Sequence, residues 1–386
     1  MRSMWLRFIW KVFLFSLIFS SLSLIAAEVK THDSSIVVPD DYHTIQDAIN
    51  HASSGDTIIV RPGIYRECIK IDKSLTIIGN GSNSTIIEGT GLGHTVEISK
   101  GVVNVTLKGF TINTTLPSSW AGIYVRGLYN SISENIIYNH KFGVKLYDST
   151  GNILRNNLMQ GNQYNLYVWG VSLSHFMHDI DTSNLVNRKP VYYLINKRNL
   201  TVPFDAGYVA IINSTDVVVA NLNLTHNLSA ILLAHSNRII IYNVTGRQNE
   251  RGIYLICSSN NRIINNTLFE NIWSGVTLIA STNNLVSGNI IYNQPYGISL
   301  SHTDTVIPNL YSNDNKIKSN LIVNNTYGIT FDKASNNLIV ENTLKNNTYA
   351  ITLDNSSNNL FYHNNFLENL FVHIKFSYNL WNKDEE

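Results

Sequence analysis

The chain has 386 residues, a formal net charge of +1 and 14% charged residues, against about 25% in typical soluble domains. This near-neutral balance argues against nucleic acid as a partner. Two cysteines, Cys68 and Cys257, lie far apart in the sequence, which argues against a disulfide scaffold and favours free thiols.

Residues 1–27 have the pattern of a signal peptide. Basic residues precede an apolar core at 12–25, and Ala26 and Ala27 offer a small-residue exit. A retained signal anchor is the alternative, and the protein would then meet a membrane only through this leader. Both interpretations place the rest of the chain outside the cytoplasmic membrane, as a secreted, periplasmic or cell-surface protein.

Residues 36–79 are predicted to form an N-terminal cap and the first coils of a solenoid. Thr44 can cap a helix at 45–52 whose apolar residues share one face. Short strands are expected to follow at 57–60, 69–71 and 75–78. A short amphipathic helix suits the open apolar end of a solenoid, which would otherwise aggregate.

Residues 80–170 and 209–378 repeat with a period near 22. The small residues that open successive copies are spaced by 22, 23, 22, 31 and 22 residues: Ala230, Gly252, Gly275, Gly297, Gly328 and Ala350. Each copy holds three short apolar runs that alternate with period 2, as strands do. The sequence therefore predicts an all-β fold, a right-handed parallel β-helix with coils of about 22 residues.

Two residue types recur at fixed places in the copies. Asparagines six residues apart are expected to stabilise corners by stacking their amides and by tolerating left-handed backbone: Asn237 and Asn243, Asn260 and Asn266, Asn283 and Asn289, Asn336 and Asn342, and Asn358 and Asn364. Aromatic residues recur near the coil starts, either as buried ladders or as an exposed stack that grips sugar faces: Tyr124, Tyr147, Tyr167, Tyr254, Trp273, Tyr296, Tyr327 and Tyr349.

The repeat breaks at residues 171–208, and a charged tail follows at 379–386. The break holds the only cluster of metal-capable side chains, in which His175, His178 and Asp181 are candidate ligands. Imidazoles suit copper(II), whereas copper(I) prefers thiolate or thioether ligands. Only Met159 and Met177 follow the leader, and no Cys-x-x-Cys or Met-x-x-Met motif occurs. A solvated loop with one structural histidine is the simpler alternative.

The break also carries a family resemblance. HDIDTSNLVNRKPVYYLIN (178–196) and VPFDAGYVAIINS (202–214) resemble the NosD-type periplasmic copper-binding family and its archaeal surface relatives. PDDYHTIQDAIN, near the N-terminus, is similar to the first coil of pectin-lyase-like β-helix proteins. The resemblance implies a role in copper delivery. It also marks candidate ligand-binding residues, namely His178, Asp181, Asn184, Lys189, Tyr192, Tyr193, Asp205 and Tyr208. Arg188 stands where relatives usually have glycine.

An enzyme of this fold would need catalytic groups on a strand face. Asp332 and Asp354 are 22 residues apart, so they are expected side by side on adjacent coils, about 5 Å apart. That separation fits a retaining glycoside hydrolase, whereas a polysaccharide lyase would need a base and a cation such as calcium. Both aspartates can equally be corner residues that cap their turns.

The leading functional hypothesis is a non-enzymatic surface protein that binds extended polysaccharide or envelope components through residues 174–208. A polysaccharide lyase or glycoside hydrolase is the first alternative, and a copper-handling protein is the second. Calcium or copper is the cofactor to test under these alternatives.

Overall fold

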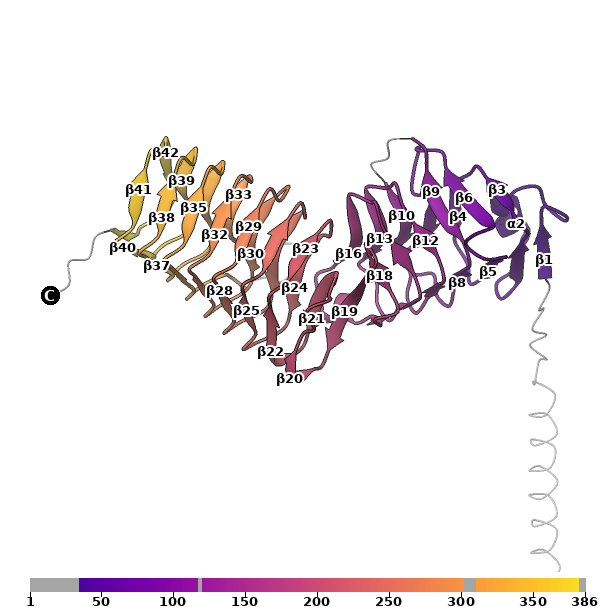
Figure 1. The fold of residues 1–386 in the computed structure, drawn as a ribbon, viewed down its shortest axis with the longest axis horizontal. Helices are drawn as coiled ribbons and strands as arrows, with labels where there is room; N and C mark the ends of the chain where they lie inside the picture. The colour runs from indigo at the N-terminus through magenta and orange to yellow at the C-terminus, as the bar shows by residue number, and fades with distance from the viewer. Residues whose placement is uncertain (1–34, 117–119, 302–309, 382–386) are drawn as a thin grey trace, which may run out of the picture. The chain divides into compact units, whose positions relative to one another are not determined.

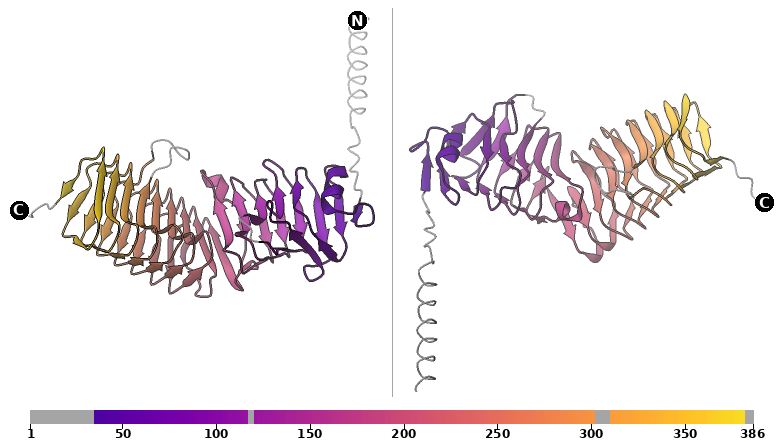
Figure 2. Two further views of the ribbon diagram at one scale, coloured as in Figure 1. Left: turned by 90° about the horizontal axis from the view of Figure 1, so that it is seen from above. Right: turned by 180° about the vertical axis from the view of Figure 1, so that it is seen from behind.

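The computed structural model describes residues 35–116, 120–301 and 310–381. The predicted signal peptide and the last five residues of the predicted tail lie outside these ranges. The described part is a parallel β-helix whose coils stack one after another along the chain (Figure 1, Figure 2). No helix in these ranges is long and apolar enough to cross a membrane.

Three sheets form the sides of the N-terminal segment, residues 35–186. Sheet A contains β1 (Ser35–Val38), β2 (Thr57–Val60), β5 (Thr76–Gly79), β8 (Thr106–Lys108), β11 (Ser131–Ser133), β14 (Ile153–Arg155) and β17 (Asp179–Ile180). Sheet B begins with β3 (Gly63–Tyr65), β6 (Thr85–Gly89), β9 (Thr111–Thr114), β12 (Ile136–Ile137), β15 (Leu158–Met159) and β18 (Leu185–Val186). Sheet C contains β4 (Ile69–Ile71), β7 (Val96–Ile98), β10 (Ala121–Val125), β13 (Phe142–Tyr147) and β16 (Tyr164–Trp169).

The C-terminal segment, residues 189–381, continues sheet B and adds two new sheets. Sheet B goes on through β19 (Lys189–Ile195), β21 (Tyr208–Ile212), β24 (Ser229–Ala234), β27 (Arg251–Ile256), β30 (Ser274–Ile279), β33 (Tyr296–Ser301), β36 (Tyr327–Asp332), β39 (Tyr349–Asp354) and β42 (Phe371–Lys375). Sheet D contains β20 (Arg198–Thr201), β22 (Thr215–Ala220), β25 (Ile240–Tyr242), β28 (Arg262–Ile264), β31 (Leu285–Ser287), β34 (Lys316–Lys318), β37 (Leu338–Val340), β40 (Leu360–Tyr362) and β43 (Leu380–Trp381). Sheet E contains β23 (Asn223–Thr225), β26 (Thr245–Arg247), β29 (Thr267–Phe269), β32 (Ile290–Tyr292), β35 (Leu321–Val323), β38 (Thr343–Lys345) and β41 (Asn365–Leu367).

The predicted N-terminal cap is confirmed. Helix α2 (Ile45–His51) begins after Thr44, whose side chain accepts a hydrogen bond from the Asp47 backbone N–H. Ile45, Ala48 and Ile49 are buried against the first coils. The strands expected at 57–60 and 69–71 are present with those bounds, as β2 and β4, and the strand expected at 75–78 begins one residue later, as β5.

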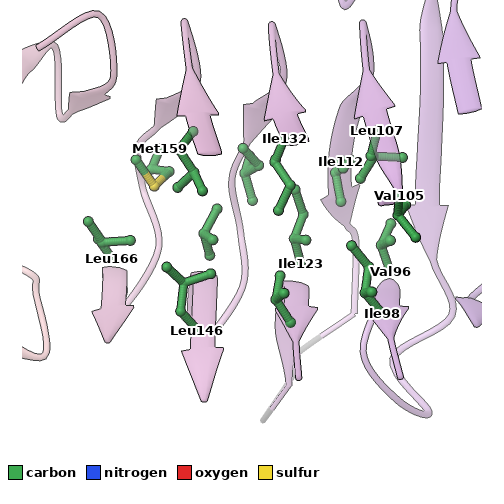
Figure 3. Close-up of a cluster of buried hydrophobic side chains, with 14 of the residues drawn as sticks. Val96, Ile98, Val105, Leu107, Ile112, Ile123, Ile132, Leu146, Met159 and Leu166 are labelled. Atoms are coloured by element: carbon green, nitrogen blue, oxygen red, sulfur yellow. The ribbon is translucent and has the colours of Figure 1, made fainter. Parts of the chain in front are cut away.

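The interior is built from the alternating apolar residues that the repeat predicts. In Figure 3, Ile123 and Leu146 of sheet C point toward Ile132 of sheet A and Met159 of sheet B. Because each strand places every second side chain inside, one coil contributes one apolar layer and buries it on the next.

Buried asparagines form ladders that run from coil to coil. In one ladder, Asn266 donates to Asn289 Oδ1 from both its backbone N and its Nδ2, each at 2.9 Å. Asn289 donates in the same way to Asn320, at 2.9 Å from both groups. The predicted pair Asn283 and Asn289 divides by role, since Asn289 is buried whereas Asn283 is an exposed corner residue with φ 58°. Asn243 of another predicted pair is itself an exposed residue with φ 51° and not a member of the buried ladder.

Two further asparagine ladders, which the sequence reasoning missed, run through the C-terminal segment. One begins at Asn261, which accepts from the Ile239 backbone N at 2.9 Å and donates its own backbone N to Asn284 Oδ1 at 2.9 Å. The other begins at Asn227, whose backbone N donates to Asn249 Oδ1 at 3.0 Å. Each coil of this segment is therefore bonded to the next at several corners.

The break in the repeat is where one segment ends and the other begins. Strands β17 and β18 complete the last coil of the N-terminal segment, after the 3-10 helix η1 (Leu173–Phe176). Strand β19 then turns back and pairs antiparallel with β18, whereas the other strand pairs of the described residues are parallel. Sheets A and C end here, and sheets D and E begin.

Strands β21, β24 and β27 of sheet B are buried on both faces. Tyr193, Ala210, Leu232 and Tyr254 form one lateral row on β19, β21, β24 and β27. This row belongs to the same buried cluster as Phe176 in the last coil of the N-terminal segment. The face of sheet B that carries this row therefore covers the apolar end of the N-terminal segment.

Candidate functional site

His178, predicted as a ligand-binding or metal-binding residue, is only 2% exposed. Its Nδ1 accepts a hydrogen bond from the Asn152 backbone N at 3.4 Å, and its Nε2 donates to the His175 carbonyl oxygen at 3.1 Å. Burial lowers the pKa of His178 to about 4, so the ring is neutral at neutral pH. His178 occupies the place that asparagine has in the preceding coils.

Three more predicted ligand-binding residues are buried. Asn184 extends a ladder by accepting from Asn157 Nδ2 at 2.9 Å. Tyr193 donates its hydroxyl to the Phe176 carbonyl oxygen at 2.7 Å, and Tyr208 is fully buried. Burial raises the pKa of both phenols. These side chains present no surface to a large ligand.

The other predicted residues are exposed or partly exposed. The Tyr192 hydroxyl donates to Asp205 Oδ1 at 2.9 Å, so the fold brings these two together. Asp181 lies 3.2 Å from Arg155 Nε. Lys189 follows a turn in which Asn187 and Arg188 have φ values of 48° and 64°. That left-handed turn explains why glycine would suit position 188.

The side chains at the break do not fit a copper or calcium site. Both ring nitrogens of His178 are already hydrogen-bonded, and His175 Nδ1 accepts from the Val171 backbone N at 3.1 Å. Asp181 is paired with Arg155. Among the described residues, no group of three or more His, Cys, Asp or Glu side chains is arranged to hold a metal ion.

Asp332 and Asp354 are lateral neighbours on β36 and β39, in the register that their spacing predicts. Both are half-buried at the end of their strands. Asp354 accepts from Asn355 Nδ2 at 3.0 Å and lies 3.9 Å from Lys375 Nζ. The geometry is that of a corner residue with local partners, and a catalytic role for the pair stays a prediction.

The recurring aromatic residues of the C-terminal segment form a stacked ladder. Tyr327 lies between Tyr296 and Tyr349, with ring centroids 4.8 and 5.1 Å away and planes within 12° of parallel. Trp273 and Phe371 continue the ladder at its two ends. Because these rings cover one another's faces, only their edges and the terminal rings are open to a ligand.

A different aromatic surface lies on the outer side of sheet C. Tyr147 of β13 and Trp169 of β16 stack with centroids 4.8 Å apart. The ring centroids of Tyr124, on β10, and His94 are 4.2 Å apart, and those of His94 and Trp120 are 5.0 Å apart. Trp120 is 42% exposed. We call this set, together with Lys145, Tyr167 and the buried side chains of Phe142 and Tyr164 that pack against Tyr124 and Tyr167, the sheet C surface.

His94 is held as a neutral ring on this surface. Its Nδ1 accepts from the Ala121 backbone N at 3.0 Å, so the proton resides on Nε2. Burial, and after it the charge of Lys145, lowers the pKa of His94 to about 4. The sheet C surface therefore combines an uncharged histidine with several aromatic rings.

Lys145 lies at the centre of the sheet C surface, and the sequence reasoning missed it. It pairs laterally with Tyr124 on one side and Tyr167 on the other. The offsets of 21 and 22 residues from Tyr124 to Lys145 to Tyr167 were the signal that could have found it. The sequence pattern had been recognised for the tyrosines only, although Lys145 occupies the equivalent position in the intervening coil.

Known proteins resemble this chain in sequence and in fold. A cell surface glycoprotein of Methanothermus fervidus is 30% identical over 176 residues, and the match covers 38% of this chain and 29% of the relative. The match thus spans less than a third of that protein. The A-module of the Azotobacter vinelandii mannuronan C-5 epimerase AlgE4 is 15% identical over 88% of this chain and 91% of its own, with a TM-score of 0.37. PfbA, a surface adhesin of Streptococcus pneumoniae, is 14% identical over 89% and 94%, also with a TM-score of 0.37.

Such distant structural likenesses carry no information on ligand or activity. The family model described as periplasmic copper-binding protein (NosD) matches residues 192–386, which are half of the chain. This match confirms the resemblance that residues 178–214 predict. The chain therefore belongs to the NosD family.

Proposed function

We propose that this NosD-family protein binds a polysaccharide chain along the sheet C surface, outside the cytoplasmic membrane. The observation that carries the proposal is the row of partly exposed rings that successive coils place side by side, from Trp120 and Tyr124 to Tyr147 and Trp169. Parallel coils repeat at about 4.8 Å, so an extended polymer can contact several of them at once.

Aromatic rings suit sugars because their apolar faces pack against the C–H faces of pyranose rings, while the tyrosine hydroxyls reach polar groups. This proposal moves the binding surface from residues 174–208 to sheet C. The reason is that His178, Asn184, Tyr193 and Tyr208 are buried. A location outside the cytoplasm is supported by the predicted leader, by the family's description as periplasmic, and by the relative's description as a cell surface glycoprotein.

Titration with a panel of soluble acidic and neutral glycans, followed by calorimetry, tests the proposal. Trp169→Ala should weaken binding about tenfold, because the indole contributes roughly 1–1.5 kcal/mol of stacking. Trp273→Ala is the matched control, since Trp273 is 46% exposed but lies on the C-terminal segment. The proposal fails when no glycan binds, or when both variants lose the same affinity.

A hydrolytic or lyase activity is the second candidate, and the register of Asp332 with Asp354 favours it. Incubation with the same glycans, with and without calcium, should release new reducing or unsaturated ends. Asp354→Asn should abolish that release. Absence of products with the wild-type protein rejects this candidate for those substrates.

A further inference from the structure

Four aromatic rings surround the ammonium group of Lys145. Its Nζ lies 5.3 Å from the ring centre of Tyr124, 4.6 Å from that of Phe142, 5.2 Å from that of Tyr147 and 4.9 Å from that of Tyr167. These residues come from three successive strands, β10, β13 and β16. The cation is therefore held by the fold rather than by one flexible neighbour.

The rings attract the ammonium but accept none of its three hydrogen bonds through a lone pair. Among the described residues, the structure gives Lys145 Nζ neither a carboxylate partner nor a hydrogen-bond acceptor. Burial lowers the pKa of Lys145, and the charge of Glu250 raises it by a smaller amount. The Glu250 carboxylate, however, is paired with Arg251 Nη1 at 2.6 Å.

A half-buried cation with unused donors is the complement of an anionic group. On a surface that also stacks sugar rings, that group is a carboxylate or a sulfate ester carried by the sugar. We infer that Lys145 makes the sheet C surface selective for acidic polysaccharides, with the anionic group of one sugar residue on the Lys145 ammonium. This inference rests on the proposed function and names its ligand class.

Charges of both signs lie around the surface, and Lys145 carries the ammonium that the four aromatic rings enclose. Glu97 pairs laterally with Tyr124 on the far side from Lys145, and Asp148 follows β13. Lys141 lies at the edge, with its Nζ 5.4 Å from the Phe142 ring centre. A neutral sugar offers the Lys145 donors only uncharged acceptors such as hydroxyl oxygens, whereas an acidic sugar offers a charged acceptor and a stronger hydrogen bond.

The test uses two probes with one backbone: oligogalacturonate and its fully methyl-esterified form, which carries no charge. A sulfated, carboxyl-free oligosaccharide forms a third arm and distinguishes sulfate from carboxylate. We expect the wild-type protein to bind at least one anionic probe about tenfold or more tightly than the ester. Lys145→Met, which keeps an apolar stem among the rings, should bind the anionic probe and the ester alike.

Two further variants keep the result interpretable. Lys141→Met should retain the preference, because its charge lies outside the ring of aromatic side chains. Lys145→Arg should restore much of the preference, because the guanidinium keeps the charge. The inference is overturned when Lys145→Met keeps the full preference, or when the wild-type protein binds the ester as tightly as the anionic probes. If binding of the probes still depends on Trp169 in that case, the proposed function survives; if no probe binds, both fall.

Discussion

The Tyr193 hydroxyl donates a 2.7 Å hydrogen bond to the carbonyl oxygen of Phe176 and thereby joins the two segments of the solenoid. Tyr193 lies on β19, the first strand of the C-terminal segment, and Phe176 lies in η1, in the last coil of the N-terminal segment. Both side chains are buried in one cluster. The segments are therefore connected by packing and polar contacts as well as by the chain.

Removing this hydroxyl should lower the free energy of unfolding. We expect Tyr193→Phe to lose about 1–2 kcal/mol, because the buried carbonyl loses one of its two donors. Tyr192→Phe is the matched control: its hydroxyl contacts Asp205 at the surface, so it should lose less than about 0.5 kcal/mol. Denaturant unfolding of the three proteins measures both values, and equal losses would contradict the joining role.

The asparagine ladder should be costly to interrupt. Asn289→Ala leaves the backbone N and the Nδ2 of Asn266 without their acceptor in the interior, so we expect a loss of about 3 kcal/mol. Asn283→Ala changes an exposed residue with φ 58°, where the strain of a left-handed alanine costs about 1 kcal/mol. Thermal unfolding compares the two. A smaller loss for Asn289→Ala than for Asn283→Ala would contradict the ladder's role.

The repeat was predictable because its signals are local. The spacing of Gly252 and Gly275 and the period-2 alternation predict the coil length and the strands, and both are confirmed. Tyr254 shows the limit of this reasoning. It stands in a repeat position, yet it is 1% exposed because the N-terminal segment covers β27. No period in the sequence reveals a contact between segments.

The candidate site was harder to predict for a related reason. His178 was predicted as a metal ligand because it stands in a family-specific phrase. In the structure its Nδ1 accepts a backbone hydrogen bond, as the Oδ1 of asparagine does in the preceding coils. An imidazole nitrogen and an amide oxygen are both acceptors, so the substitution keeps the ladder. Lys145 was not predicted as a site residue, because its surroundings depend on aromatic rings from the coils before and after it.

Copper binding at the break should be absent or weak. Since His178 uses both ring nitrogens and Asp181 pairs with Arg155, we expect His175→Ala to leave a copper(II) titration of the protein unchanged. Calorimetry at neutral pH, with the wild-type protein alongside, measures this. One equivalent of copper that disappears in His175→Ala would show that the break rearranges to bind the metal.

Acid should destabilise the protein through its buried histidines. Burial lowers the pKa values of His140 and His178 to about 4, against an ordinary value near 6.5. The unfolded chain therefore takes up protons first as the pH falls below 6.5, and stability is lost progressively down to about pH 4. At pH 5 each histidine accounts for about 2 kcal/mol of that loss.

His178→Asn isolates one of these contributions, because asparagine keeps an acceptor in the ladder and does not titrate. We expect this variant to lose about 2 kcal/mol less than the wild-type protein between pH 7.5 and pH 5. His373→Asn, on the exposed strand β42, should follow the wild-type curve. Denaturant unfolding at the two pH values measures the difference. If His178→Asn and the wild-type protein lose equal stability, His178 is protonated in the fold and its hydrogen bonds differ from those described.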